Sequence, residues 1–276
     1  MTWKAYKLVF CLLSPMHIGW IKQGNVQRTR PYLTGKALWG ALTARLTRDR
    51  PQSGDYQTVG QQVRDELAFS YFYPAVSETV DLWPWGETAD EFAWRYLGSY
   101  AGTALNYGRN TAEEGSLHET EFIAPHTRNG QPVYLVGYLF ERQNCNLPWR
   151  EVLPRLQFGG ERTYGWGRVK LHKLEENNEQ FFDLSLHLDG DRPVVLLPSG
   201  KRLLAHTLAT DTQNGKSLLS VRGSLEPLVG RETHDAQNFG GTLSQARICW
   251  EPGSAVSEEV RLKILEDGIW ACQATP

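Results

Sequence analysis

Residues 158–169 read FGGERTYGWGRV and place four glycines within nine positions, directly before a strand-like alternation. Glycine lets a backbone turn sharply and approach a ligand, and consecutive N–H groups in such a turn favour anions such as phosphates. Arg162 and Arg168 add positive charge, and Tyr164 and Trp166 offer flat faces on which bases can stack. This composition is typical of nucleic-acid binding. The alternative is a tight turn whose glycines serve its geometry and whose aromatic residues belong to the core.

The segments before this loop alternate strands and helices. Residues 3–13 mix alternation with a continuous apolar run, which is typical of a strand near the centre of a sheet. The 3.6-residue spacing after Thr34, a plausible N-cap, predicts a helix. We expect a loop over residues 49–63, a strand over 67–73, strands over 117–124 and 132–141 joined as a hairpin at Asn129-Gly130, a helix over 148–157 and a strand over 169–174. The order predicts an α+β fold with a ferredoxin-like (RRM-like) domain over residues 1–175.

Two further regions complete the predicted organisation. Residues 75–116 are acidic and rich in Trp, and they interrupt the first domain as an insertion in which residues 90–100 loosely fit a short amphipathic helix. Residues 176–276 contain strand candidates at 182–188, 194–197, 218–222, 246–250 and 269–272, separated by Gly, Pro and Asn. They predict a second, β-rich domain.

Charge is unevenly distributed along the chain. Residues 1–50 carry nine Lys and Arg and one acid, a net charge of +8, whereas residues 51–276 have a net charge of −10. Opposite blocks of this size indicate that one face meets a polyanion. The alternative is that the charges are spread over solvated faces.

Several common sites are missing from the sequence. It contains no Walker phosphate loop, no GxGxxG after a strand, no HExxH and no GxSxG. The four cysteines are scattered without zinc-ligand spacing, so we expect them to be reduced, with no metal and no cofactor. No stretch approaches the roughly 20 apolar residues of a membrane span. We expect a cytoplasmic protein with no membrane partner.

Three segments together resemble the RAMP superfamily, the repeat-associated RNA-binding proteins of CRISPR systems. The pattern Gly160-x-Arg162-x-x-Gly165-x-Gly167 resembles the glycine-rich loop of that family. Residues 15–19 (PMHIG) look like its apolar-His-apolar-Gly turn, and residues 32–42 (YLTGKALWGAL) are similar to its helix opening. Residues 225–232 (LEPLVGRE) also look like the second half of type III members. The resemblance implies ferredoxin-like domains that bind CRISPR RNA, the second domain being degenerate.

The position of the loop indicates a role within that family. Precursor-processing members usually carry the loop near the end of the chain, whereas about a hundred residues follow it here. The chain therefore looks more like the type III effector subunit that holds the repeat-derived 5′ handle of the guide RNA in antiviral defence. That role implies three partners: CRISPR RNA, other effector subunits including the large polymerase-like subunit and backbone RAMP subunits, and target RNA through the complex. Residues 75–116 are then a protein–protein or thumb-like element, or else an ordinary solvated excursion.

The expected RNA contacts lie in the turn after the first strand, in the first helix opening and in the glycine-rich loop. Lys36 would join the helix start in holding a phosphate, and Arg28 and Arg30 would contact phosphates. The full set is His17, Arg28, Arg30, Gly35, Lys36, Gly159, Gly160, Arg162, Thr163, Tyr164, Gly165, Trp166, Gly167 and Arg168.

The main alternative is a ribonuclease on the same fold. His17 would then act as a general base on a ribose 2′-hydroxyl and process precursor RNA, or Asp49 or Asp55 would serve target-RNA cleavage by a backbone subunit. Otherwise His17 is a hydrogen-bonding residue of a turn and the two acids belong to a solvated loop. We expect no catalytic residue. A third interpretation is a glycan-binding or scaffold protein that uses its ten Trp as platforms.

Overall fold

The computed structural model describes residues 2–50, 55–209, 219–232 and 240–273. Its first sheet has the strand order β11-β1-β10-β4, and β5 also pairs with β10. All pairings in this sheet are antiparallel. The strands are β1 (Trp3–Leu12), β4 (Leu67–Phe69), β5 (Tyr73–Ala75), β10 (Tyr134–Arg142) and β11 (Val169–Glu176).

The central position predicted for the first strand is confirmed, because β1 lies between β10 and β11 and both of its faces are buried. Leu8 and Phe10 face the core that the helices cover. Trp3 and Ala5 are odd-numbered and lie on the opposite face of the strand, where they belong to a second core shared with the C-terminal sheet. Burial on both faces explains why the run is continuously apolar.

Helices cover one face of this sheet. As predicted, α1 (Gly35–Arg48) begins at Thr34, whose side chain accepts a hydrogen bond from the Ala37 N–H. The helix predicted over residues 148–157 is present as a short α-helix, α4 (Trp149–Val152). It continues as a 3₁₀ turn, η2 (Leu153–Arg155).

The prediction of a loop over residues 49–63 is wrong for its second half, because α2 spans Tyr56–Glu66. Asp55 is its N-cap and accepts hydrogen bonds from the N–H groups of Gln57 and Thr58. The apolar side chains that this helix buries are those of Val59 and Val63, in an otherwise mostly polar segment. The apolar stripe is too thin to give a helical pattern in the sequence.

The predicted hairpin over residues 117–141 is also corrected. Both strands exist, but β9 (His118–Ile123) pairs with β6 (Leu97–Gly102) and β3 (Val26–Thr29), whereas β10 pairs with β1. The tight turn is present, with Gly130 at φ +76° and the Thr127 N–H donating to the Gln131 carbonyl. This turn therefore connects strands of two different sheets.

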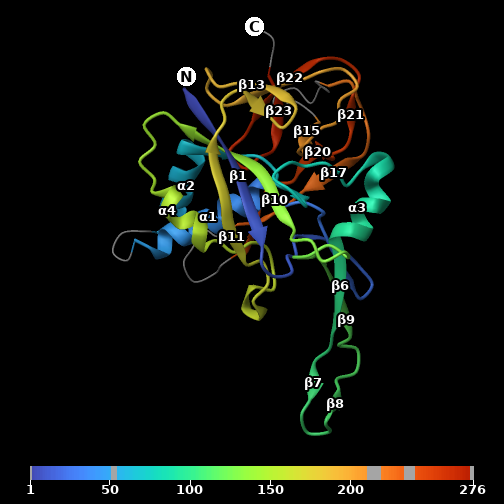
Figure 1. The fold of residues 1–276 in the computed structure, drawn as a ribbon. Coiled ribbons are helices and arrows are strands. Elements are labelled where there is room, and N and C mark those ends of the chain that lie inside the picture. The colour runs from blue at the N-terminus through green and yellow to red at the C-terminus, as the bar shows by residue number, and fades with distance from the viewer. Residues whose placement is uncertain (1, 51–54, 210–218, 233–239, 274–276) are drawn as a thin grey trace.

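The insertion forms a projecting arm (Figure 1). A 3₁₀ turn, η1 (Gly86–Thr88), and α3 (Ala89–Tyr96) precede it. The arm itself consists of β6 and β9, with β7 (Leu105–Asn106) and β8 (Thr111–Ala112) at its tip. At its base β2 (Gly19–Gln23) completes a sheet of order β2-β3-β9-β6. The arm thus begins inside the predicted insertion and extends beyond it to residue 123.

The C-terminal part is β-rich, as predicted. Its eight-stranded sheet packs on the face of the first sheet opposite the helices (Figure 1). In sheet order its strands are β12 (Gln180–Phe181), β13 (Leu184–His187), β14 (Val194–Leu197), β22 (Val260–Ile264), β23 (Trp270–Cys272), β15 (Thr207–Leu208), β20 (Arg247–Trp250) and β17 (Leu225–Leu228). Two short pairs add β16 (Val221–Arg222) with β21 (Ala255–Val256) and β18 (Arg231–Glu232) with β19 (Thr242–Leu243). Residue 218 of the expected strand 218–222 lies outside the described residues. The chain is a mixed α+β fold with several antiparallel sheets.

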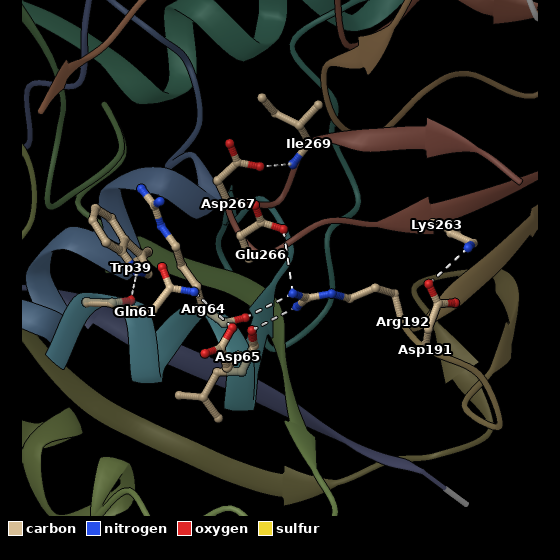
Figure 2. A network of polar contacts seen from close by, with 12 residues as sticks. Trp39, Gln61, Arg64, Asp65, Asp191, Arg192, Lys263, Glu266, Asp267 and Ile269 are labelled. Atoms are coloured by element: carbon tan, nitrogen blue, oxygen red, sulfur yellow. Dashed lines mark hydrogen bonds and ion pairs between the residues drawn. The ribbon is translucent and has the colours of Figure 1, made fainter. Parts of the chain in front are cut away.

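Arg192, in the loop before β14, joins the two parts of the chain (Figure 2). Its guanidinium donates to the carbonyl of Arg64 at 3.0 Å and to that of Leu67 at 3.5 Å, where α2 ends. It also lies 5.5 Å from the ring centroid of Trp3. Cations are favoured at this end of a helix.

We expect Arg192→Ala to lower the free energy of unfolding by about 1–3 kcal/mol, because the carbonyls at the end of α2 lose a largely buried donor. Lys263→Ala is the matched control, since its contact with Asp191 (3.0 Å) is solvent-exposed and contributes within about 0.5 kcal/mol. Urea denaturation measures both changes. Equal losses in the two variants would show that Arg192 does not join the two parts.

Candidate nucleic-acid interface

The glycine-rich loop folds back onto the turn that follows β1. The N–H of Gly160 donates to the His17 carbonyl at 2.9 Å, and that of Gly167 donates to the Pro15 carbonyl at 2.6 Å. Within residues 160–168, the N–H groups of residues 164–166 donate to loop carbonyls and that of Arg168 donates to Ser14. Most of the loop's N–H groups therefore bond within the protein, and among the described residues the consecutive free N–H groups that the sequence predicts are confined to residues 161–163.

The glycines allow this close approach. A Cβ atom on Gly159 would lie 2.2 Å from the His17 carbonyl oxygen, and one on Gly167 would lie 1.8 Å from that of Phe158. Both have positive φ, +80° and +73°. Gly159 and Gly167 thus serve the geometry of a tight turn, which is the alternative interpretation of this segment, whereas a Cβ on Gly160 would make only ordinary contacts.

The side chains of the loop point outward. Arg162, Thr163 and Arg168 are exposed, and Tyr164 is 80% exposed. Within the described residues, neither arginine side chain forms a hydrogen bond or an ion pair. Trp166 is half-buried, with its ring edge-on to that of Phe122 on the arm at 5.2 Å. The loop therefore offers two cations and one free aromatic face at Tyr164.

His17 is buried in the turn beneath this loop. Its Nδ1 lies 2.7 Å from the Glu121 carbonyl on β9, and because a carbonyl only accepts, this nitrogen carries the hydrogen in the neutral ring. The side chain thereby ties the turn to the arm. This arrangement agrees with the alternative in which His17 is a hydrogen-bonding residue.

Arg30 is engaged within the protein rather than free to contact a phosphate. Its guanidinium donates to both oxygens of Glu226 on β17, at 2.5 and 3.1 Å, and its side chain is 11% exposed. The His206 Nε2–H donates to the same carboxylate at 2.9 Å, and the His206 Nδ1 accepts from the Tyr71 hydroxyl at 2.8 Å. Burial opposes ionisation of Glu226, but the hydrogen bonds from His206 and Arg30 outweigh it and lower the pKa to about 2. Burial also lowers the pKa of His206.

The opening of α1 is covered by the second part of the chain. A Cβ atom on Gly35 would lie 2.6 Å from the Asp267 carbonyl oxygen and 2.8 Å from the Gly268 Cα. Gly35 is therefore a packing glycine and not a phosphate contact. The next residue, Lys36, lines an open cleft.

That cleft, of about 360 Å³, lies between α1 and the second sheet. It adjoins a cavity of about 300 Å³ with which it shares Lys36, Trp39, Ser244, Arg247 and Asp267. We call the two together the groove. Its cations come from segments far apart in the sequence and are Arg30, Lys36, Arg64, Arg231 and Arg247, and Glu266 and Asp267 are the acids that line it.

An aromatic wall forms one side of the groove. The Trp39 indole N–H donates to the Gly60 carbonyl at 3.1 Å, and the Arg64 guanidinium lies 4.6 Å above the Trp39 ring (Figure 2). Tyr56 stands edge-on to Trp39 at 6.3 Å. Arg162 is near enough to Tyr56 to lower the pKa of that phenol, although burial raises it overall. The glycine-rich loop packs on His17 and Ile18, and Ile18 lines the groove, so the loop adjoins it.

Opposite this wall, Arg247 forms an ion pair with Asp267, whose other oxygen accepts from the Ile269 N–H at 3.3 Å. Arg64, Arg231 and Arg247 are not among the RNA contacts predicted from the sequence. The one local signal was the segment 225–232, which contains Arg231 but has no recognisable chemistry by itself.

The two candidate nuclease acids and Arg28 each have partners. Asp49 pairs with Arg45 at 2.8 Å and with Arg155 at 2.6 Å, and these bonds outweigh desolvation and lower its pKa. Asp55 caps α2, and hydrogen bonds from Thr58 and Gln57 lower its pKa. The Arg28 Nε lies 3.2 Å from a Glu121 carboxylate oxygen.

In the described part of the chain, no group of three or more His, Cys, Asp or Glu could hold a metal ion. None of the helices in that part of the chain has the length and apolarity needed to cross a bilayer.

Comparison with known proteins shows relatives by fold only. No protein-family model and no curated protein matches the chain. A chain of the type III-B Cmr-beta bound to cognate target RNA and AMPPnP aligns with 91% of this chain and 85% of its own, with a TM-score of 0.54 and 13% identity. A chain of a second type III-B Cmr-beta structure, bound to cognate target RNA, aligns with 91% of this chain and 86% of its own, with a TM-score of 0.53 and 14% identity. The mixed α+β fold of this chain is therefore shared with chains of type III-B Cmr-beta structures.

Proposed function

We propose that this chain is a CRISPR RNA-binding subunit of a type III effector complex, and that it holds the repeat-derived 5′ handle of the guide RNA. The observation that carries this proposal is the groove, where cations from both parts of the chain converge beside an aromatic wall and the exposed arginines of the glycine-rich loop. Cations at several points along one channel suit a phosphate backbone, and aromatic faces suit its bases.

The fold supports the same role. The order β11-β1-β10-β4, with helices between the first and second and between the third and fourth of these strands along the chain, is compatible with the ferredoxin-like arrangement. Chains of similar fold occur in structures that contain target RNA. In this role the projecting arm is a thumb-like element or a contact with a neighbouring subunit.

We infer that the chain binds RNA without cutting it. Each candidate nuclease residue already has a structural role: His17 ties the turn to the arm, Asp49 is ion-paired and Asp55 caps α2. A glycan-binding surface would need exposed Trp side chains. Of the ten Trp, which all lie within the described residues, only Trp20 and Trp94 are exposed, which weakens the glycan-binding alternative.

The test measures the affinity for guide RNA carrying a repeat-derived 5′ handle, at several salt concentrations. We expect Arg162→Ala and Lys36→Ala each to weaken binding about 5–10-fold, and each to reduce the log-log salt slope by about 0.7, because each removes one phosphate contact from a single strand. Arg142→Ala is the control, since Arg142 is exposed and pairs with Trp3 at the end of β1 remote from the loop.

Equal weakening by all three variants would mean that charge alone attracts the RNA and that the groove is not its site. The same reactions test for cleavage. A ribonuclease yields discrete products that disappear in His17→Ala or Asp55→Ala, whereas the binding role predicts intact RNA throughout.

A further inference from the structure

A separate cavity of about 230 Å³ opens at the base of the arm. Arg30 is the one residue that it shares with the groove. Its walls come from β2, β3 and β9 of the arm sheet, from α3, and from the segment that follows β20. Four of the lining residues are aromatic: Trp20, Tyr32, Trp85 and Phe92.

Three glutamates line this cavity, and two of them are fully engaged. Glu121 accepts from the Thr29 N–H at 3.0 Å and pairs with Arg28, while Glu226 belongs to the Arg30 and His206 network. Glu251 differs, because its half-buried carboxylate has no hydrogen bond or ion pair in the described part of the chain. Burial and the nearby Glu226 raise its pKa. Burying an ionised carboxylate raises the free energy of the folded protein unless hydrogen-bond donors contact it.

The cavity also presents donors. Arg28 contacts Glu121 through Nε, its side chain is 42% exposed, and its terminal nitrogens donate to no group among the described residues. Because Arg30 is held by Glu226, the groups that remain available are the Glu251 carboxylate, which accepts, and the terminal nitrogens of Arg28, which donate. A planar group that carries adjacent donors next to an acceptor would satisfy both.

Among the RNA bases, guanine has that edge. Its N1–H and N2–H₂ donors are adjacent and O6 follows them, so one carboxylate can accept both hydrogens while an arginine donates to O6. Adenine and cytosine place a ring nitrogen lone pair beside their single amine, which a carboxylate would repel. Uracil has one donor between two acceptors.

We propose that this cavity receives one unpaired guanine of the bound RNA, with Glu251 accepting from N1–H and N2–H, Arg28 donating to O6, and the exposed Trp20 and half-buried Trp85 offering faces for stacking on the ring. The proposal rests on the RNA-binding function proposed above. It makes Glu251 a residue that determines which base is accepted at one position.

The test uses the full chain and labelled oligoadenylates of about 12 nucleotides, with a single guanine placed at each position in turn. Inosine, which lacks the N2 amine, replaces guanine in a third set. We expect the best guanine oligomer to bind about 10-fold or more tightly than the oligoadenylate, and inosine to lose part of that gain. Glu251→Gln should remove the preference and leave the oligoadenylate affinity unchanged. Glu259→Gln, at an exposed glutamate, is the matched control.

The possible outcomes separate the two proposals. If the wild-type chain binds every oligomer equally, the guanine site is wrong and the RNA-binding function stands. If it binds none, both proposals fail. If Glu251→Gln keeps the base preference but loses a co-purifying protein, the cavity receives a partner protein's cation instead of a base. Arg28→Gln tests the other half of the site and should also reduce the preference for guanine over adenine.

Discussion

Replacing Gly167 with alanine is expected to lower the free energy of unfolding by about 4 kcal/mol or more and to abolish RNA binding. The added Cβ would lie 1.8 Å from the Phe158 carbonyl oxygen, a distance at which the two atoms clash. Phe158 is fully buried in the core under α1, so its backbone cannot retreat without moving its ring. The substitution also strains the backbone at φ +73°. Chemical denaturation monitored by tryptophan fluorescence measures the loss.

Gly165→Ala is the matched control for this variant. Gly165 lies in the same loop at φ +83°, but no atom is within 4 Å of the position of its Cβ. We expect a loss of about 1 kcal/mol, from backbone strain alone. If Gly165→Ala and Gly167→Ala are equally destabilised, the close contact with Phe158 is not what requires a glycine.

Local patterns predicted the elements whose formation depends on neighbours in sequence. The apolar run of residues 3–13 and the capped 3.6-residue spacing after Thr34 appear as β1 and α1. The helix α2 escaped prediction because two valines anchor it and its remaining stability comes from a cap and from packing on α1. The hairpin at Asn129-Gly130 failed for a different reason. An Asn-Gly turn fixes the chain reversal, but which strands pair is decided by distant partners.

The candidate site shows the same division. The glycine-rich loop and Lys36 were identified from the sequence, yet most of the loop's N–H groups bond within the protein, whereas its arginine side chains remain available. The sequence could not indicate Arg64, Arg231 and Arg247, because the fold brings them together from segments far apart. Arg30 is a similar case, since its partner Glu226 is 196 residues away. From the sequence, a basic residue in a connecting segment is a reasonable candidate for a phosphate contact. Only the structure shows that a carboxylate distant in sequence already pairs with it.

The second large effect is expected at Glu226. Glu226→Gln leaves Arg30, whose side chain is 11% exposed, without a counterion, and turns a carboxylate that accepts from two side chains into an amide that donates. Removing one partner of a buried ion pair typically costs about 3–5 kcal/mol. We expect a loss of that size near neutral pH, measured by urea denaturation. Glu78→Gln, which breaks an exposed pair with Lys173, should change stability little by comparison.

The dependence on pH shows whether this loss comes from charge. The pKa of Glu226 is lowered from 4.5 to about 2, so its ionised form stabilises the folded chain at pH values above about 4.5, and that contribution is lost as the pH falls towards 2. A shift of this size corresponds to about 3 kcal/mol. The stability difference between wild type and Glu226→Gln should therefore narrow as the pH falls from about 5 to about 2. A difference that stayed constant across this range would mean that Glu226 stabilises the folded chain through the packing of its side chain rather than through its charge.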